Sequence, residues 1–162
     1  MPGGAARDSI EVIAGVAEQQ LPAVRAILAE YADLPHNVGR QTGTEEELAG
    51  LPNPWVPPAG DILTAWADGA VVGCVVLAKL GPESCEMKRL YVREAARGRG
   101  LGRRLVQAVI ERGRELGYRQ MLLDTAPELA AARALYGRLG FREIEPYHAR
   151  YADPICFEYD LV

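Results

Sequence analysis

The hydrophobic positions of this chain follow two spacings, one typical of helices and one typical of strands. Apolar residues three and four positions apart predict two longer helices, at 21–31 and 101–116. Short apolar and β-branched runs predict strands at 9–14, 62–67, 70–80, 84–92, 120–124, 141–147 and 155–161. The dipeptide Asp68-Gly69, between the second and third of these strands, is typical of a tight hairpin turn.

Two Thr-x-x-Glu motifs predict the starts of two further, shorter helices, because such a pair can satisfy free N–H groups at a helix end. Thr44 with Glu47 predicts one of them, and Thr125 with Glu128 predicts the other. The element order becomes β-α-α-β-β-β-α-β-α-β-β. It predicts one domain over residues 1–162, of the α/β or α+β class with a mixed sheet.

The strand at 84–92 breaks the strict alternation of apolar and polar residues. Its apolar positions Met87, Leu90 and Val92 are three and then two residues apart. One inserted residue, a β-bulge, would reconcile this spacing with a strand. Because bulges often lie beside active sites, this strand is a candidate part of a functional site.

Charge changes this picture because it is unevenly spread. The chain has a net charge of −4, yet residues 88–104 hold seven cations and one carboxylate. A local basic patch on an acidic protein indicates one compact polyanionic ligand and argues against general nucleic-acid binding. The alternative is a solvated helix start with surplus arginine.

A glycine-arginine loop lies inside this basic patch, before the helix predicted at 101–116. Its sequence is Arg97-Gly98-Arg99-Gly100-Leu101-Gly102. Glycines let the backbone approach a ligand closely, and free N–H groups at a helix start favour a phosphate. A P-loop would require Gly-Lys-Ser/Thr, which is absent, and a dinucleotide fingerprint would require a glycine where Arg103 stands.

Two motifs resemble those of the GNAT superfamily of acyltransferases. Arg97-x-x-Gly100-x-Gly102 resembles the pyrophosphate loop of this family, and Leu135-Tyr136-x-x-x-Gly140-Phe141 resembles its later signature. The segment 85–92 is also similar to a bacterial-type GNAT subgroup whose members are mostly uncharacterised. The resemblance is strong over residues 85–145 and rests on element order elsewhere.

The resemblance implies an N-acetyltransferase that moves an acetyl group from acetyl-CoA to the primary amine of a small molecule, by direct attack in a ternary complex. It implies a bulged and splayed fourth strand whose backbone binds the pantetheine arm. A protein or peptide amine acceptor, and a non-catalytic acyl-CoA-binding module, are the alternatives; a homodimer through the C-terminal strands is common in the family. The implied cofactor-binding residues are Leu90, Tyr91, Val92, Arg97, Gly98, Arg99, Gly100, Leu101, Gly102 and Arg103.

Two side chains are candidates for catalysis. Tyr136 is the candidate general acid, since a phenol of pKa about 10 can protonate a thiolate of pKa about 8.5; the alternative is a tyrosine that only packs. Glu86 is the candidate base or anchor for a substrate ammonium, and the alternative is a surface carboxylate paired with Lys88 or Arg89. For Asp124, helix capping is favoured over a place in the cleft.

Other polar and aromatic residues have weaker signals. Trp55 is expected to pack on the core, and His36 and His148 are expected to be surface or packed histidines. The cluster 147–151 is a candidate lining of an acceptor pocket, in which Arg150 would hold a substrate carboxylate.

The cysteines and apolar runs bear on location. Cys74, Cys85 and Cys156 lie far apart inside apolar segments, which predicts buried thiols and neither a disulfide framework nor a metal site. No apolar run reaches the roughly 18 residues that span a bilayer, and Met1 to Ser9 lacks the apolar stretch of a signal peptide. A cytoplasmic protein is therefore expected, with no metal, membrane or nucleic acid as partner.

Overall fold

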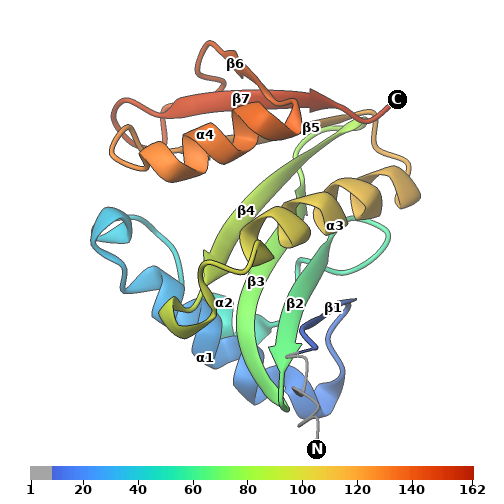
Figure 1. Cartoon of the computed structure of the whole chain (residues 1–162). Coiled ribbons are helices and arrows are strands. Elements are labelled where there is room, and N and C mark those ends of the chain that lie inside the picture. The colour runs from blue at the N-terminus through green and yellow to red at the C-terminus, as the bar shows by residue number, and fades with distance from the viewer. Residues whose placement is uncertain (1–8) are drawn as a thin grey trace, which may run out of the picture.

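The computed structural model describes residues 9–162, so the expectation for the segment before Ser9 lies outside it. Helices and strands follow in the predicted order (Figure 1). The helices are α1 (Leu21–Ala32), α2 (Glu45–Gly50), α3 (Leu101–Glu115) and α4 (Ala130–Leu139). The strands are β1 (Glu11–Ala14), β2 (Asp61–Ala67), β3 (Ala70–Lys79), β4 (Ser84–Val92), β5 (Gln120–Thr125), β6 (Arg142–Ile144) and β7 (Ile155–Asp160).

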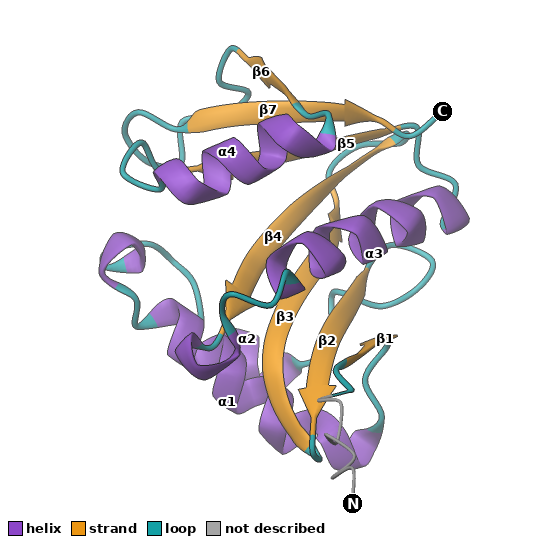
Figure 2. Cartoon of the chain, in the orientation of Figure 1, coloured by secondary structure: helices purple, strands orange, loops and turns teal. Residues whose placement is uncertain are grey.

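The strands form one mixed sheet in the order β1-β2-β3-β4-β5-β7-β6 (Figure 2). Neighbouring strands are antiparallel except β4 and β5, which are parallel. These two strands pair only over residues 84–86 of β4 and then separate. The mixed sheet and the splayed fourth strand expected from the sequence are therefore confirmed.

Helices cover both faces of the sheet, and the alternation along each strand decides which side chain meets which helix. On β3, Val75 and Leu77 belong to the cluster built with α3, whereas Cys74 and Val76 belong to the cluster built with α1. All four are fully buried. Tyr136 of α4 joins the α3 cluster, so α3 and α4 share one face of the sheet and α1 covers the other.

The bulge expected in β4 lies at Arg89 and Leu90. On β3, Val75 alone faces these two residues. Arg89 has a φ of 56°, a left-handed conformation that is uncommon for a residue with a side chain. Its guanidinium is held at 2.7 Å from a Glu47 carboxylate oxygen. The bulge is confirmed, and α2 is tied to it by this ion pair.

One of the two helix-start motifs is confirmed and the other is wrong. The Thr44 hydroxyl accepts a hydrogen bond from the Glu47 N–H at 3.1 Å at the start of α2. Thr125 instead ends β5, where it pairs with Ile155, and α4 begins only at Ala130 with no side-chain cap. Thr125 is therefore part of a strand and cannot cap the helix that the Thr125–Glu128 motif predicted.

Trp55 is buried in the α1 cluster, so its expected packing on the core is confirmed. In the part of the chain that the structure describes, no helix is long and apolar enough to cross a membrane.

The three cysteines give a prediction about thiol reactivity. All are buried and none forms a disulfide, and burial raises the pKa of Cys74 and of Cys85 to about 12. A raised pKa removes the reactive thiolate, so at pH 8 the folded protein should react with dithiobis(nitrobenzoate) on the order of a hundredfold more slowly than the protein in urea. Absorbance of the released thiolate measures both rates. Fast reaction of any thiol in the folded protein would contradict the buried placement.

Candidate functional site

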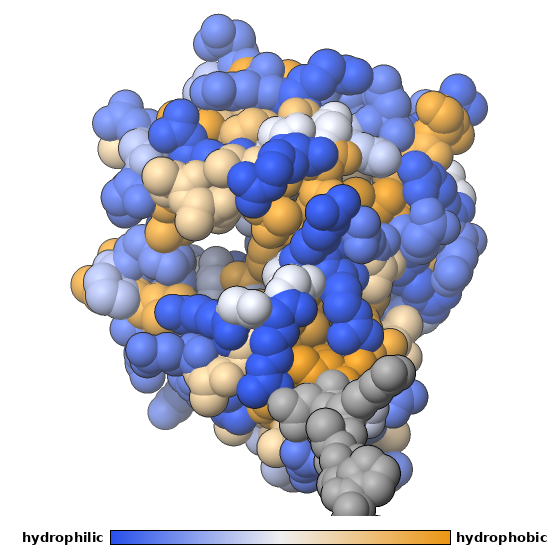
Figure 3. All heavy atoms as spheres, in the orientation of Figure 1, coloured by the Kyte–Doolittle hydropathy of each residue, from blue (hydrophilic) through white to orange (hydrophobic). Residues whose placement is uncertain are grey.

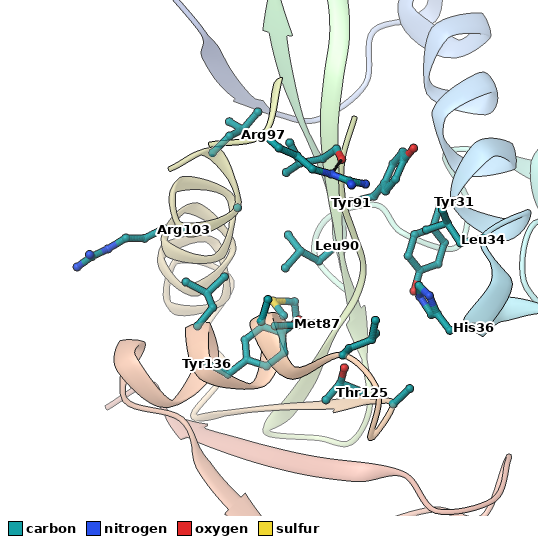
Figure 4. Close-up of a pocket in the computed structure, with 18 of the residues that line it drawn as sticks. Tyr31, Leu34, His36, Met87, Leu90, Tyr91, Arg97, Arg103, Thr125 and Tyr136 are labelled. Atoms are coloured by element: carbon teal, nitrogen blue, oxygen red, sulfur yellow. Dashed lines mark hydrogen bonds between the residues drawn. The ribbon is translucent and has the colours of Figure 1, made fainter. Parts of the chain in front are cut away.

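A cavity of about 600 Å³ opens where β4 and β5 separate. Figure 3 shows the surface hollowed between α4 and the segment that joins α1 to α2, and Figure 4 shows side chains from β4, α3 and α4 around this space. Nine of the ten residues implied for cofactor binding line it: Leu90, Tyr91, Val92, Arg97, Gly98, Gly100, Leu101, Gly102 and Arg103. Arg99 is the one that does not.

The glycine loop has the geometry of an anion site. Gly98 and Gly100 have φ values of 81° and 70°, which favour glycine, and a Cβ added at either would meet no atom within 4 Å. The first helical bond of α3 runs from the Arg104 N–H to the Gly100 carbonyl at 3.1 Å. Among described residues, the N–H groups of 101–103 have no backbone acceptor. They point out of the positive end of the helix dipole, where a phosphate binds favourably.

The two arginines that border the cavity from this loop differ in direction. The Arg97 Nε donates to the Val92 carbonyl at 3.0 Å and so fastens the loop to β4. Figure 4 shows the Arg103 side chain extending away from the cavity on the far side of α3. Arg97 is therefore the better placed of the two to meet a phosphate in the cavity.

The edge of β4 offers a second kind of contact. Beyond Glu86, residues 87–92 have no partner strand on the side of β5 within the described range 9–162. Backbone N–H and C=O groups that face this gap need partners, because an unpaired strand edge readily takes up an extended chain. An extended ligand laid along β4 can supply them.

Tyr136 enters the same cavity from α4. Its ring is buried and packs against Phe141 and Phe157, with ring centroids 5.8 Å apart in both pairs. In the described chain its hydroxyl has no hydrogen-bond partner, and Figure 4 shows the ring beside Met87. Burial raises the pKa of Tyr136, so the phenol stays protonated at neutral pH.

Glu86 is buried rather than at the surface, and it lines neither this cavity nor the second one described below. Its carboxylate accepts from the Tyr147 hydroxyl at 2.6 Å and from the Arg150 guanidinium at 2.7 Å. The Lys88 Nζ lies 3.6 Å away. The ion pair between Glu86 and Lys88 is therefore present, but the shorter contact of Glu86 is with Arg150. Because Arg150 is already paired, it is not free to bind a substrate carboxylate as the sequence suggested.

Asp124 does not cap a helix, contrary to the favoured expectation. It lies where β5 diverges from β4, and it accepts hydrogen bonds from the Tyr151 hydroxyl, from His148 Nε2 at 2.8 Å and from Arg150 at 3.3 Å. The Nδ1 atom of His148 accepts the Arg150 N–H at 3.2 Å, so Nε2 carries the proton in the neutral ring. His148 is thus a packed histidine with a fixed partner.

A second cavity, of about 420 Å³, adjoins the first. Residues from the segment between α1 and α2, from the β4 bulge and from the segment between β6 and β7 line it. The two cavities share the residues Tyr31, Arg40, Met87, Lys88 and Asp124. Sequence reasoning had found no motif in the segment that supplies Arg40, because its place in the site depends on contacts with distant parts of the chain.

Comparison with known proteins identifies the class. The model of the acetyltransferase (GNAT) family matches residues 21–141, so the chain belongs to this family of acyltransferase enzymes. The chain is 43% identical over 106 residues to the uncharacterized N-acetyltransferase C1271.07c of Schizosaccharomyces pombe, a match that covers 64% of this chain and 65% of that protein. It is 34% identical over 125 residues to the uncharacterized N-acetyltransferase YjgM of Escherichia coli, covering 75% of this chain and 74% of that protein.

Solved structures show the same fold. A GNAT acetyltransferase from Staphylococcus aureus superposes with a TM-score of 0.80 at 19% identity, covering 95% of this chain and all of that one. The structure of yncA from Salmonella typhimurium with its cofactor acetyl-CoA superposes with a TM-score of 0.71 at 20% identity, covering 95% of each chain.

The buried carboxylate of Glu86 gives a prediction about stability. Arg150→Gln removes the guanidinium that compensates it and should lower the free energy of unfolding by about 2 kcal/mol, since Arg150 is itself half exposed. Urea unfolding followed by circular dichroism measures the change. Arg119→Gln, at an exposed arginine outside both cavities, is the control and should change stability little. Equal losses in the two variants would show that the Glu86 contacts contribute nothing.

Proposed function

We propose that this chain transfers an acetyl group from acetyl-CoA to the primary amine of a small molecule, by direct attack in a complex that holds both substrates. The observation that carries the proposal is the junction of two cavities at five shared residues. A pure acyl-CoA-binding module has no use for the second cavity. A small acceptor is favoured over a peptide because segments 37–42 and 150–151 bound that cavity.

Acetyl-CoA fits the first cavity through three of its features. The glycine loop and the first turn of α3 are suited to the pyrophosphate, with Arg97 beside them. The unpaired edge of β4 at 87–92 is suited to the amide-bearing pantetheine arm. When bound, acetyl-CoA supplies an activated acyl group joined to a thiolate leaving group, and the yncA structure holds this cofactor on the same fold.

The residues around the junction can carry the transfer. Strand N–H groups near Leu90 can hydrogen-bond the thioester carbonyl oxygen, a contact typically worth about 2.7–4 kcal/mol in such sites. The amine nitrogen forms its bond to the acyl carbon while the carbon–sulfur bond breaks, and the electron pair leaves on sulfur. Tyr136 gives its proton to sulfur and recovers one from water, and solvent takes the proton lost from nitrogen.

We assign Glu86 a positioning role outside the reacting groups. Its contacts with Tyr147 and Arg150 hold the segment between β6 and β7 over the second cavity. The role of base or ammonium anchor that the sequence suggested for Glu86 stays a prediction, and the pH profile of Glu86→Gln tests it.

We also propose a reduced, cytoplasmic setting, which the three free cysteines favour. A homodimer through the C-terminal strands stays a prediction.

A thiol-release assay with acetyl-CoA and a panel of primary amines tests the proposal. We expect at least one amine to be acetylated, with one coenzyme A thiol released for each product detected by mass spectrometry. Binding of acetyl-CoA without turnover on any small amine would contradict the proposed function.

Tyr136→Phe should lower turnover about tenfold or more while leaving the affinity for acetyl-CoA unchanged, because only the proton donor is lost and the ring still packs. Steady-state kinetics with the best amine and calorimetric titration with acetyl-CoA give the two values. Unchanged turnover would remove Tyr136 from the mechanism.

Glu86→Gln distinguishes the two roles of that carboxylate. If it positions Arg150 and its segment, activity should fall by a similar factor at every pH. If Glu86 accepts the proton of the amine, the loss should be greatest at low pH, where free amine is scarce. The measurement is the ratio of the rate of Glu86→Gln to that of the unaltered protein between pH 6 and pH 9. A ratio that is constant with pH indicates positioning, and a ratio that falls toward low pH indicates a base.

A further inference from the structure

One arginine of the second cavity has no carboxylate partner among the residues that the structure describes. Arg40, between α1 and α2, stacks its guanidinium over the Tyr151 ring at 3.8 Å from the ring centroid. The other cations that line the cavity are each paired: Lys88 with Glu86, Arg150 with Glu86 and Asp124, and Arg89 with Glu47. Arg40 therefore carries the surplus positive charge of this cavity.

A negative group is fixed close to this positive one by the same side chain. The Tyr151 hydroxyl donates to the Asp124 carboxylate, while the face of its ring lies under Arg40. Asp124 and Arg40 both line the two cavities. Asp124 also accepts from His148 and from Arg150, so an ammonium group bound there would share this carboxylate with them. A carboxylate and a guanidinium thus lie on either side of one phenol ring, which matches a small molecule that bears both charges.

Two buried side-chain oxygens on the cavity lining also need partners. Asn37 is 2% exposed, and its Nδ2 donates to the Tyr31 carbonyl at 2.7 Å, which leaves Oδ1 without a hydrogen bond. The Thr42 hydroxyl oxygen is buried and likewise has no partner among the described residues. An unsatisfied buried polar atom costs about 1–3 kcal/mol. Both residues line the second cavity, so its wall holds unused hydrogen-bonding capacity, although neither oxygen is exposed to the open space.

We propose that the acceptor is an amino-acid-type molecule, whose carboxylate binds Arg40 and whose ammonium group binds Asp124; the proposal rests on the acetyl transfer proposed above. The bound ammonium group gives one proton to solvent before the neutral amine attacks the thioester. One unpaired guanidinium matches the single charge of a carboxylate, whereas a phosphate dianion calls for more unpaired cations. Because Asp124 also borders the first cavity, an amine held there faces the space that Tyr136 enters.

The test compares each of a set of α-amino acids with its carboxamide and its decarboxylated amine as acceptors, with phosphoethanolamine and glucosamine 6-phosphate as phosphate-bearing amines. We expect the best acceptor to be a free acid, with kcat/KM about tenfold or more above its carboxamide, because the carboxamide leaves Arg40 unpaired. Arg40→Gln should raise KM for that acid about tenfold, with little change in kcat, and leave the carboxamide unaffected. Arg119→Gln is the matched control and should act as the unaltered protein does.

Calorimetric titration of the same amino acids in the presence of coenzyme A gives a readout that does not require turnover. Saturable binding that Arg40→Gln abolishes supports the site even if no amine is acetylated, and in that case only the proposed function falls. Equal rates with acids, carboxamides and plain amines, or a preference for the phosphate-bearing amines, overturn the carboxylate site and leave acetyl transfer standing. An equal loss on acids and carboxamides in Arg40→Gln also overturns it.

Discussion

The structure depends on one constraint, the early end of pairing between β4 and β5. Pairing stops after residue 86, because the two strands diverge, and the sheet is left with a gap instead of a continuous ladder. The glycine loop, the open edge of β4 and Tyr136 all line the cavity at this gap. The bulge at Arg89 lies on the other edge of β4, where the strand still pairs with β3, so β4 keeps its place in the sheet while its far edge stays open. The open edge and the glycine loop that follows β4 then present backbone groups to the same cavity.

A second set of contacts closes the site from the C-terminal side. The segment between β6 and β7 crosses to Glu86 and Asp124, and its Tyr147, His148, Arg150 and Tyr151 donate to these two carboxylates. One carboxylate lies where β4 still pairs with β5, and the other where β5 has left it. The segment is therefore hydrogen-bonded to β4 and β5 on both sides of the point where they separate. Its Tyr151 ring also stacks against the Arg40 guanidinium. Replacing one carboxylate should alter the position of Arg150 at the other, because Arg150 contacts both.

The elements that sequence reasoning predicted well are those that local spacing determines. The stripe of α3, the irregular spacing in β4 and the glycine loop each follow from residues close together in the chain, and each was found where expected. The errors have a common cause. Thr125 has the local pattern of a helix start, but pairing with a strand 30 residues later takes it into β5. The partners of Glu86 lie 61 and 64 residues away, and those of Asp124 lie 24 to 27 residues away. No local pattern indicates such pairs. The residue types of the cluster 147–151 indicated that it could line a pocket, but the partners of these side chains emerge only from the fold.

Calorimetric titration of the intact protein with acetyl-CoA tests most directly whether the gap beside β4 is an acyl-CoA site. We expect saturable binding with a Kd in the micromolar range, a binding free energy on the order of −8 kcal/mol. That affinity should weaken in Arg97→Ala, whose side chain fastens the glycine loop to β4, and persist in Arg119→Ala. Absence of binding by the intact protein would show that this gap is not an acyl-CoA site, and the glycine loop would then be no more than an arginine-rich helix start.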